Sequence, residues 1–176
     1  MSKVGKKPIV IPEKVKVNKE DDSLVITGPL GELKLNIPND IEVVVEENII
    51  KVKPRKINKL TKKLWGTIRS LINNAVLGVI QGYEKKLIIE GLGYQAQVNG
   101  NNLILKIGYT HPVSLKIPEN LKVKVDKNII SVWGIDKQKV GNFAAIVRKQ
   151  KPPEPYHGKG IRYENEIIKK KAGKKA

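Results

Sequence analysis

Hydrophobic and polar residues alternate with a period of two along most of this chain. The alternating segments are bounded by turn residues, which is typical of β-strands. In the first half they are Leu24–Thr27, Leu33–Ile37, Ile41–Val45 and Ile49–Val52. In the second half they are Leu87–Glu90, Tyr94–Val98, Leu103–Ile107, Val113–Ile117, Leu121–Val125 and Ile129–Trp133. Asn99 and Gly100 separate two of these segments and predict a hairpin turn, because both residues tolerate positive φ.

Each half then changes to helical spacing. The first helix is predicted over 58–80, and its apolar face is Leu60, Leu64, Ile68, Leu71, Ile72, Ala75 and Val79. The second is predicted over 137–149, and its apolar face is Val140, Phe143, Ala144 and Val147. Asp136 is a candidate N-cap of the second helix, and Pro152 and Pro153 end it. The pattern predicts an α+β fold of two modules, each a small antiparallel sheet packed against a helix.

The two modules are related by an internal repeat. Residues 37–52 and 117–132 align at an offset of 80, and half of these positions are identical, including the Ile-Pro pair and the Asn-Ile-Ile run. Such a match indicates duplication. We therefore expect a first domain over 1–82 and a second over 83–152, followed by a basic tail over 153–176.

The charge of the chain is strongly positive and unevenly distributed. Its 176 residues hold 34 Lys and Arg against 17 Asp and Glu, a net charge of +17. The segment 148–176 carries ten basic and three acidic side chains, and residues 1–20 carry six and two. Basic extensions on a globular body favour nucleic acid as the partner. An anionic membrane surface is less favoured, because no basic amphipathic helix with bulky apolar residues opposite is present.

The sequence gives little support for catalysis or for a bound cofactor. There is no cysteine, no apolar run long enough for a membrane span and no signal-peptide pattern, so we expect a soluble cytoplasmic protein. The run Gly91–Ala96 matches the dinucleotide fingerprint, but a hairpin rather than a helix is predicted after it. His111 lies in a turn context, and no nucleophile with a base and an orienting group is recognisable. We expect no enzyme, no cofactor, no metal and no small-molecule substrate.

The segment from the end of the second helix onward combines cations, glycines and tyrosines. It contains Arg148, Lys149, Lys151, Tyr156, His157, Gly158, Lys159, Gly160, Arg162 and Tyr163. Cations contact phosphates, glycines permit close approach of the backbone, and tyrosines stack on bases. Lys169, Lys170, Lys171, Lys174 and Lys175 extend the same charge. We take these fifteen residues as the candidate RNA-binding set.

The run Pro153–Tyr163 resembles the C-terminal signature of the bacterial-type family of large ribosomal subunit protein six. Other landmarks resemble that family at 2–9, 27–31, 91–94 and 108–113, so the similarity covers essentially the whole chain. It implies a structural protein of the large ribosomal subunit that binds 23S-type rRNA, mainly through the C-terminal domain and tail. It further implies a location near the sarcin–ricin loop and the factor-binding stalk base, with other large-subunit proteins as neighbours and translation factors nearby.

Carried over by position, the family's contact set includes Lys149, Lys151, Tyr156, Lys159, Arg162 and Tyr163, with Gly158 and Gly160 allowing close approach. The chain departs from the family at His157, where lysine is common. We expect one phosphate contact there to be weaker, or to depend on protonation of the imidazole.

Two alternatives and one further surface stay open. A free-standing regulatory nucleic-acid-binding protein would bind generic duplexes, and an enzyme would use the turn at 91–96 for a nucleotide. The run 53–63 holds six cations and no acid, so it is either a second RNA surface or a solvated loop and first helical turn. We also expect both domains to fold without residues 150–176.

Overall fold

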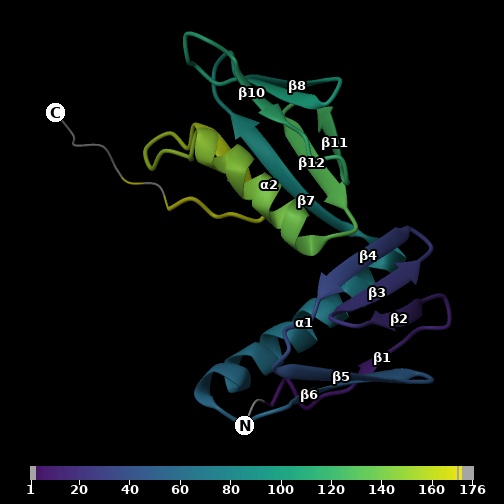
Figure 1. Ribbon diagram of the computed structural model, residues 1–176. Helices are drawn as coiled ribbons and strands as arrows, with labels where there is room; N and C mark the ends of the chain where they lie inside the picture. Colours follow the sequence, from purple (N-terminus) through teal and green to yellow (C-terminus); the bar gives the residue numbers. More distant parts are fainter. Residues whose placement is uncertain (1–2, 170, 172–176) are drawn as a thin grey trace. The chain divides into compact units, whose positions relative to one another are not determined.

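A computed structural model of the chain describes residues 3–169 and residue 171. The chain forms two compact units. The first runs to Gly82 and includes Ile135–Lys137, and the second comprises Tyr83–Gly134 and continues from Gln138. Each unit combines one helix with two small antiparallel sheets (Figure 1), which confirms the α+β fold predicted from the sequence. Two sheets stand in each unit where one was expected.

In the first unit, two three-stranded sheets pack against one long helix. The strands are β1 (Ile9–Val10), β2 (Lys16–Glu20), β3 (Ser23–Gly28), β4 (Gly31–Asn36), β5 (Ile41–Glu46) and β6 (Ile49–Pro54). The sheet orders are β2-β3-β4 and β1-β6-β5, and α1 (Lys59–Gln81) contacts both. Side chains alternate as the sequence pattern predicts: Ile41 and Val43 are buried, whereas Glu42 between them is exposed.

Helix α1 begins after a capping box. The Asn58 side chain accepts a hydrogen bond of 2.7 Å from the Thr61 backbone N–H, and the Thr61 hydroxyl accepts one of 2.9 Å from the Asn58 N–H. Thr61 is fully buried, and its hydroxyl also donates a hydrogen bond to the Lys56 carbonyl. Leu60, which the periodicity assigned to the buried face, is instead 60% exposed because its neighbour Thr61 turns inward. Gly82 ends the helix with φ of 69°.

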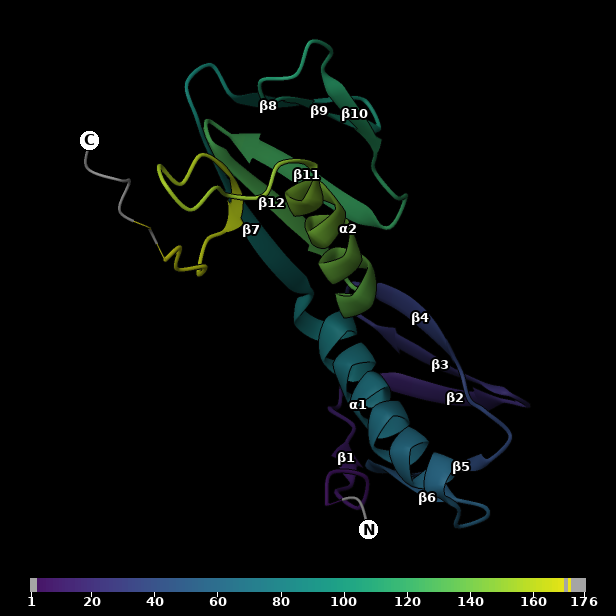
Figure 2. The same ribbon diagram turned by 90° about the vertical axis from the view of Figure 1, so that its left-hand side faces the viewer.

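The second unit repeats this plan and adds a strand. Its strands are β7 (Tyr83–Glu90), β8 (Gln95–Asn99), β9 (Asn102–Lys106), β10 (Val113–Lys116), β11 (Leu121–Asp126), β12 (Ile129–Gly134) and β13 (Gly160–Tyr163). The sheets run β10-β9-β8 and β11-β12-β7-β13. Helix α2 (Lys137–Gln150) lies across one face of the four-stranded sheet (Figure 2) and buries Val140, Phe143, Ala144 and Val147, the face predicted from the sequence.

The internal repeat has a direct structural counterpart. Strands β5 and β6 sit 80 residues before β11 and β12 with identical lengths. The carbonyls of Asn48 and Asn128 accept equivalent hydrogen bonds of 2.8 Å from Ile11 and Ile89. The prolines that precede β5 and β11 likewise accept one from the first residue of each strand. The duplication therefore extends to individual backbone bonds.

Three strands of the structure were not predicted from the sequence, and the predicted hairpin turn is shifted by one residue. Strand β1 has two residues, and β2 has a single apolar residue, Val17. Neither is long or regular enough to show a period of two. Strand β13 follows a Pro-Gly-rich run and was expected to be an extended tail. In the predicted hairpin Asn99 pairs with Asn102, so the central residues are Gly100 and Asn101, and Gly100 has φ of 57°.

Among the described residues, no helix is both long and apolar enough to cross a lipid bilayer.

Candidate nucleic-acid interface

The basic segment after α2 folds into a tight loop, which we call the 151–160 loop. Its ends are held by a 2.7 Å hydrogen bond from the Ile161 N–H to the Lys151 carbonyl. Inside it, the Glu154 N–H donates to the Lys159 carbonyl at 3.0 Å, and the Gly158 N–H donates to the Glu154 carbonyl at 3.1 Å. The loop therefore has a defined backbone and is not a free linker.

Its two glycines are structural requirements of the loop. Gly158 is buried and has φ of 77°, and Gly160 is buried and has φ of 143°. A Cβ on Gly160 would lie 2.6 Å from the Pro152 carbonyl oxygen and 2.7 Å from the Pro153 Cα. Positive φ and this close backbone contact both favour glycine. Gly160 therefore has a role in close packing within the protein. Close approach of RNA to Gly158 and Gly160 stays a prediction.

Strand β13 fastens the loop to the core of the second unit. It pairs antiparallel with β7, with Ile161 opposite Ile89 and Arg162 opposite Ile88. Ile161 is fully buried. The Arg162 guanidinium donates a 2.6 Å hydrogen bond to the Glu90 carboxylate. Strand β13 thus supplies part of this core, and removal of residues 150–176 would leave a hole where Ile161 packs. That both domains fold without residues 150–176 stays a prediction.

Arg148 at the end of α2 forms a small charged cluster with the segment after β13. Its guanidinium donates to the Glu166 carboxylate, with one Nε–Oε2 distance of 2.8 Å, and lies 5.7 Å from the Tyr163 ring centroid. Glu166 also accepts from the Tyr163 N–H at 3.1 Å. The hydrogen bond from Arg148 holds the pKa of Glu166 below its ordinary value of 4.5 and raises that of Arg148.

The other predicted contact residues point into solvent. Lys149, Tyr156, His157, Lys159, Lys169 and Lys171 are all exposed, and Tyr156 is 54% exposed. Within residues 3–169 and 171, no carboxylate forms an ion pair with these lysines. Lys170, Lys174 and Lys175 lie outside the described residues. The candidates that the structure describes therefore divide into residues that hold the 151–160 loop in place and residues whose side chains are exposed.

Two aromatic contacts at this surface were missed by the sequence analysis. The Lys151 ammonium lies 4.7 Å from the Tyr109 ring centroid, and the Tyr109 hydroxyl donates a 2.9 Å hydrogen bond to the Gln150 carbonyl. Tyr109 is 51% exposed. The Lys85 ammonium approaches the Tyr163 ring at 5.9 Å. Tyr109 lies in the turn Gly108–Pro112, so only its aromatic character and turn position signalled it in the sequence.

The arrangement offers no phosphate cradle at the fingerprint-like run. Gly91–Tyr94 is a turn that leads directly into strand β8, and no helix begins there. In the described part of the chain, no three histidine or carboxylate side chains are grouped so as to hold a metal ion.

Comparison with known proteins identifies the family. The family model of ribosomal protein L6 matches residues 11–82 and 90–164. The chain belongs to the ribosomal protein L6 family. It is 51% identical over 176 residues to the large ribosomal subunit protein uL6 of Dictyoglomus thermophilum, covering 99% of this chain and 98% of that protein. It is 46% identical over 175 residues to protein uL6c of Arabidopsis thaliana, covering 98% and 78% respectively.

Membership of the L6 family makes this a structural ribosomal protein rather than an enzyme. The first matched segment lies in the first unit, and nearly all of the second lies in the second unit. The second segment ends at residue 164, so the 151–160 loop and β13 belong to the shared L6 fold, whereas Lys169 and Lys171 lie beyond it. The resemblance recognised from the sequence is confirmed.

Gly141 within α2 and Gly160 at the end of the 151–160 loop give a matched pair of substitutions. We expect Gly160→Ala to lower the free energy of unfolding by about 2 kcal/mol or more, because φ and the Pro152 contact both oppose a Cβ. Gly141→Ala should raise it by about 0.5–1 kcal/mol, because Gly141 is helical and no atom lies within 4 Å of its Cβ position. Urea unfolding followed by circular dichroism measures both, and equal effects would contradict this account of the loop.

The Arg148–Glu166 contact predicts a pH-dependent stability. Because the folded-state pKa of Glu166 lies below 4.5, the stabilisation is complete above that pH and is lost as pH falls through the folded value. Glu166→Gln should cost about 1 kcal/mol at pH 7. The difference between wild type and variant should shrink below about pH 4.5. A difference that is constant from pH 7 to pH 3 would show that the contact does not depend on the carboxylate charge.

Proposed function

We propose that this protein is a structural component of the large ribosomal subunit that binds 23S-type rRNA, mainly through its second unit and C-terminal segment. The bound region is proposed to be close to the sarcin–ricin loop and the factor-binding stalk base, with other large-subunit proteins as neighbours and translation factors nearby. The protein acts in the ribosome, in the cytoplasm. The main support for the proposal is the sequence identity of 46–51%, over nearly all of this chain, to proteins named large ribosomal subunit protein uL6 or uL6c.

The geometry of the 151–160 loop supports this surface as the RNA contact. Lys149 in the last turn of α2 and Lys159 in the loop are exposed cations on backbone that internal hydrogen bonds fix in place. A cation held on an ordered loop loses less conformational freedom on binding than one on a flexible tail. Each phosphate contact releases counterions from the RNA, which supplies affinity that depends on salt.

Exposed aromatic rings beside these cations complete the surface. Tyr156 stands at the tip of the 151–160 loop, and Tyr109 stands under the Lys151 ammonium. Aromatic side chains stack on unpaired bases or sugars, which phosphate contacts alone do not recognise. Arg148, Arg162 and Tyr163 act differently in this proposal: they hold the loop, and their contribution to RNA binding is through its shape.

The ribosomal role is tested by sedimentation of cell lysates on sucrose gradients. We expect the protein to migrate with the large subunit and with assembled ribosomes in low salt, and to stay there after a high-salt wash. Migration only at the top of the gradient would contradict the proposal and favour the free-standing regulatory nucleic-acid-binding protein.

The RNA surface is tested with two pairs of lysine substitutions in the second unit. The double variant Lys149→Ala with Lys159→Ala should weaken binding to an rRNA transcript containing the sarcin–ricin loop. The slope of log affinity against log salt should fall by about one for each lysine, since each contributes one phosphate contact.

The matched control is Lys116→Ala with Lys124→Ala, which removes the same charge from exposed positions on strands β10 and β11. It should leave the slope close to that of the wild type. An equal loss in both double variants would mean that overall charge, and not the 151–160 loop, binds the RNA. An unrelated duplex of equal length measures the non-specific part.

A further inference from the structure

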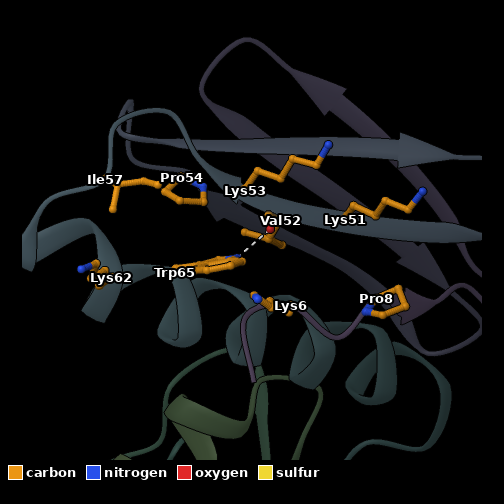
Figure 3. Close-up of a pocket in the computed structure, with 9 residues that line it drawn as sticks. All are labelled: Lys6, Pro8, Lys51, Val52, Lys53, Pro54, Ile57, Lys62 and Trp65. Carbon is orange, nitrogen blue, oxygen red and sulfur yellow. Dashed lines mark hydrogen bonds between the residues drawn. The ribbon is translucent and has the colours of Figure 1, made fainter. Parts of the chain in front are cut away.

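The first unit contains a pocket that the proposed rRNA surface does not use. It has a volume of about 530 Å³ and lies between the end of β6, the first turns of α1 and the N-terminal segment (Figure 3). Trp65, Val52 and Pro54 form its interior, and Ile57 stands at its mouth with 74% of its surface exposed. We call it the Trp65 pocket. It includes part of the basic run 53–63 whose role the sequence left open.

The indole of Trp65 is fixed in the pocket and has no polar group to spare. Its Nε1–H donates a 2.6 Å hydrogen bond to the Val52 carbonyl, which Figure 3 shows as the dashed line. A Cβ on Gly5 would lie 2.7–2.8 Å from three ring atoms, so the backbone at Gly5 packs on the ring. Trp65 is only 9% exposed. The pocket thus presents a rigid, apolar interior.

Four lysines help to line the pocket, and we call them the lysine rim. Lys6, Lys51, Lys53 and Lys62 all line it. Lys51 pairs with Glu46 at 2.7 Å. For the other three, no carboxylate lies within ion-pair distance in the part of the chain that the structure describes. An occupant that brings its own negative charges would therefore complement the rim.

A nucleotide base fits this pocket poorly. Recognition of an unpaired base uses stacking on an open aromatic face and hydrogen bonds to the base edges. The Trp65 ring is covered, its N–H is already used, and the remaining interior residues are apolar. An aliphatic or aromatic side chain meets none of these difficulties, because it requires only apolar contact.

We propose that the Trp65 pocket binds an acidic segment of a protein partner, which inserts one bulky apolar side chain and sets carboxylates against the lysine rim. A side chain anchored in a dry pocket supplies most of the affinity of such a contact, and the surrounding charges supply steering and specificity. The site lies wholly in the first unit and is independent of the rRNA surface of the second.

The test uses the full chain and a panel of fluorescein-labelled peptides. Each peptide carries three glutamates on either side of a Gly-X-Gly centre, where X is Phe, Leu, Trp, Met or Ser. At about 150 mM salt, where exposed charges are screened beyond roughly 8 Å, at least one apolar centre should bind about tenfold more tightly than the Ser peptide. In NMR spectra the bound peptide should shift the indole N–H resonance of Trp65 and not that of Trp133, which serves as an internal control.

Matched variants locate the binding. Ile57→Ser should weaken the best peptide about fivefold, whereas Leu60→Ser, at an exposed position outside the pocket, should not. Lys53→Ala with Lys62→Ala should weaken it about tenfold, and Lys59→Ala with Lys63→Ala less than twofold. All these side chains are exposed, so the variants should fold, and unfolding followed by tryptophan fluorescence verifies this.

Three outcomes would overturn the proposal. In the first, no apolar peptide binds better than the Ser peptide. In the second, the two lysine pairs have equal effects, which would indicate general charge attraction. In the third, a single-stranded RNA oligonucleotide binds the wild type and loses affinity in Ile57→Ser while the peptides do not, which would make RNA the occupant.

Discussion

The pairing of β13 with β7 is the constraint on which the proposed RNA surface depends. It buries Ile161 in the core of the second unit and so fixes one end of the 151–160 loop, while α2 fixes the other. The loop closes because Gly160 brings its backbone against Pro152. Burial of one isoleucine and one close backbone contact thus turn a Pro-Gly-rich run into an ordered support for exposed cations.

Whether a positive charge of this segment is balanced within the protein depends on how close the residue lies to strand β13. Arg162 lies in β13, and Arg148 is linked by Glu166 to the backbone of its last residue, so both positive charges are largely balanced within the protein. Lys149 and Lys159 make none of these contacts and are exposed, so their charges are available to a binding partner. Sequence alone presents all of them as equivalent cations. The difference arises because carboxylates far away in the chain, such as Glu90, are brought beside some of them.

The fold was largely predictable because its signals are local and occur twice. The period of two, the helical spacing and the offset of 80 can all be recognised in the sequence, and each corresponds to strands or helices of the structure. Two features that escaped prediction depend on contacts between distant segments: the pairing that makes Gly160–Tyr163 a strand and the approach of Lys151 to Tyr109. The Trp65 pocket is of the same kind, since its walls come from three separate parts of the first unit. The burial of Thr61 in place of Leu60 depends instead on local hydrogen bonds with Lys56 and Asn58.

The two units differ in the strand that covers one edge of their sheets. In the first unit the edge strand β1 has two residues between Pro8 and Pro12, which makes it a poor template for a foreign strand. In the second unit β7 has eight residues, and β13, the last strand of the described chain, covers half of them. During synthesis this side of β7 stays open until β13 has emerged. In the first unit one side of β6 pairs with β1, which precedes β6 in the chain, so that side has its partner strand as soon as β6 is made.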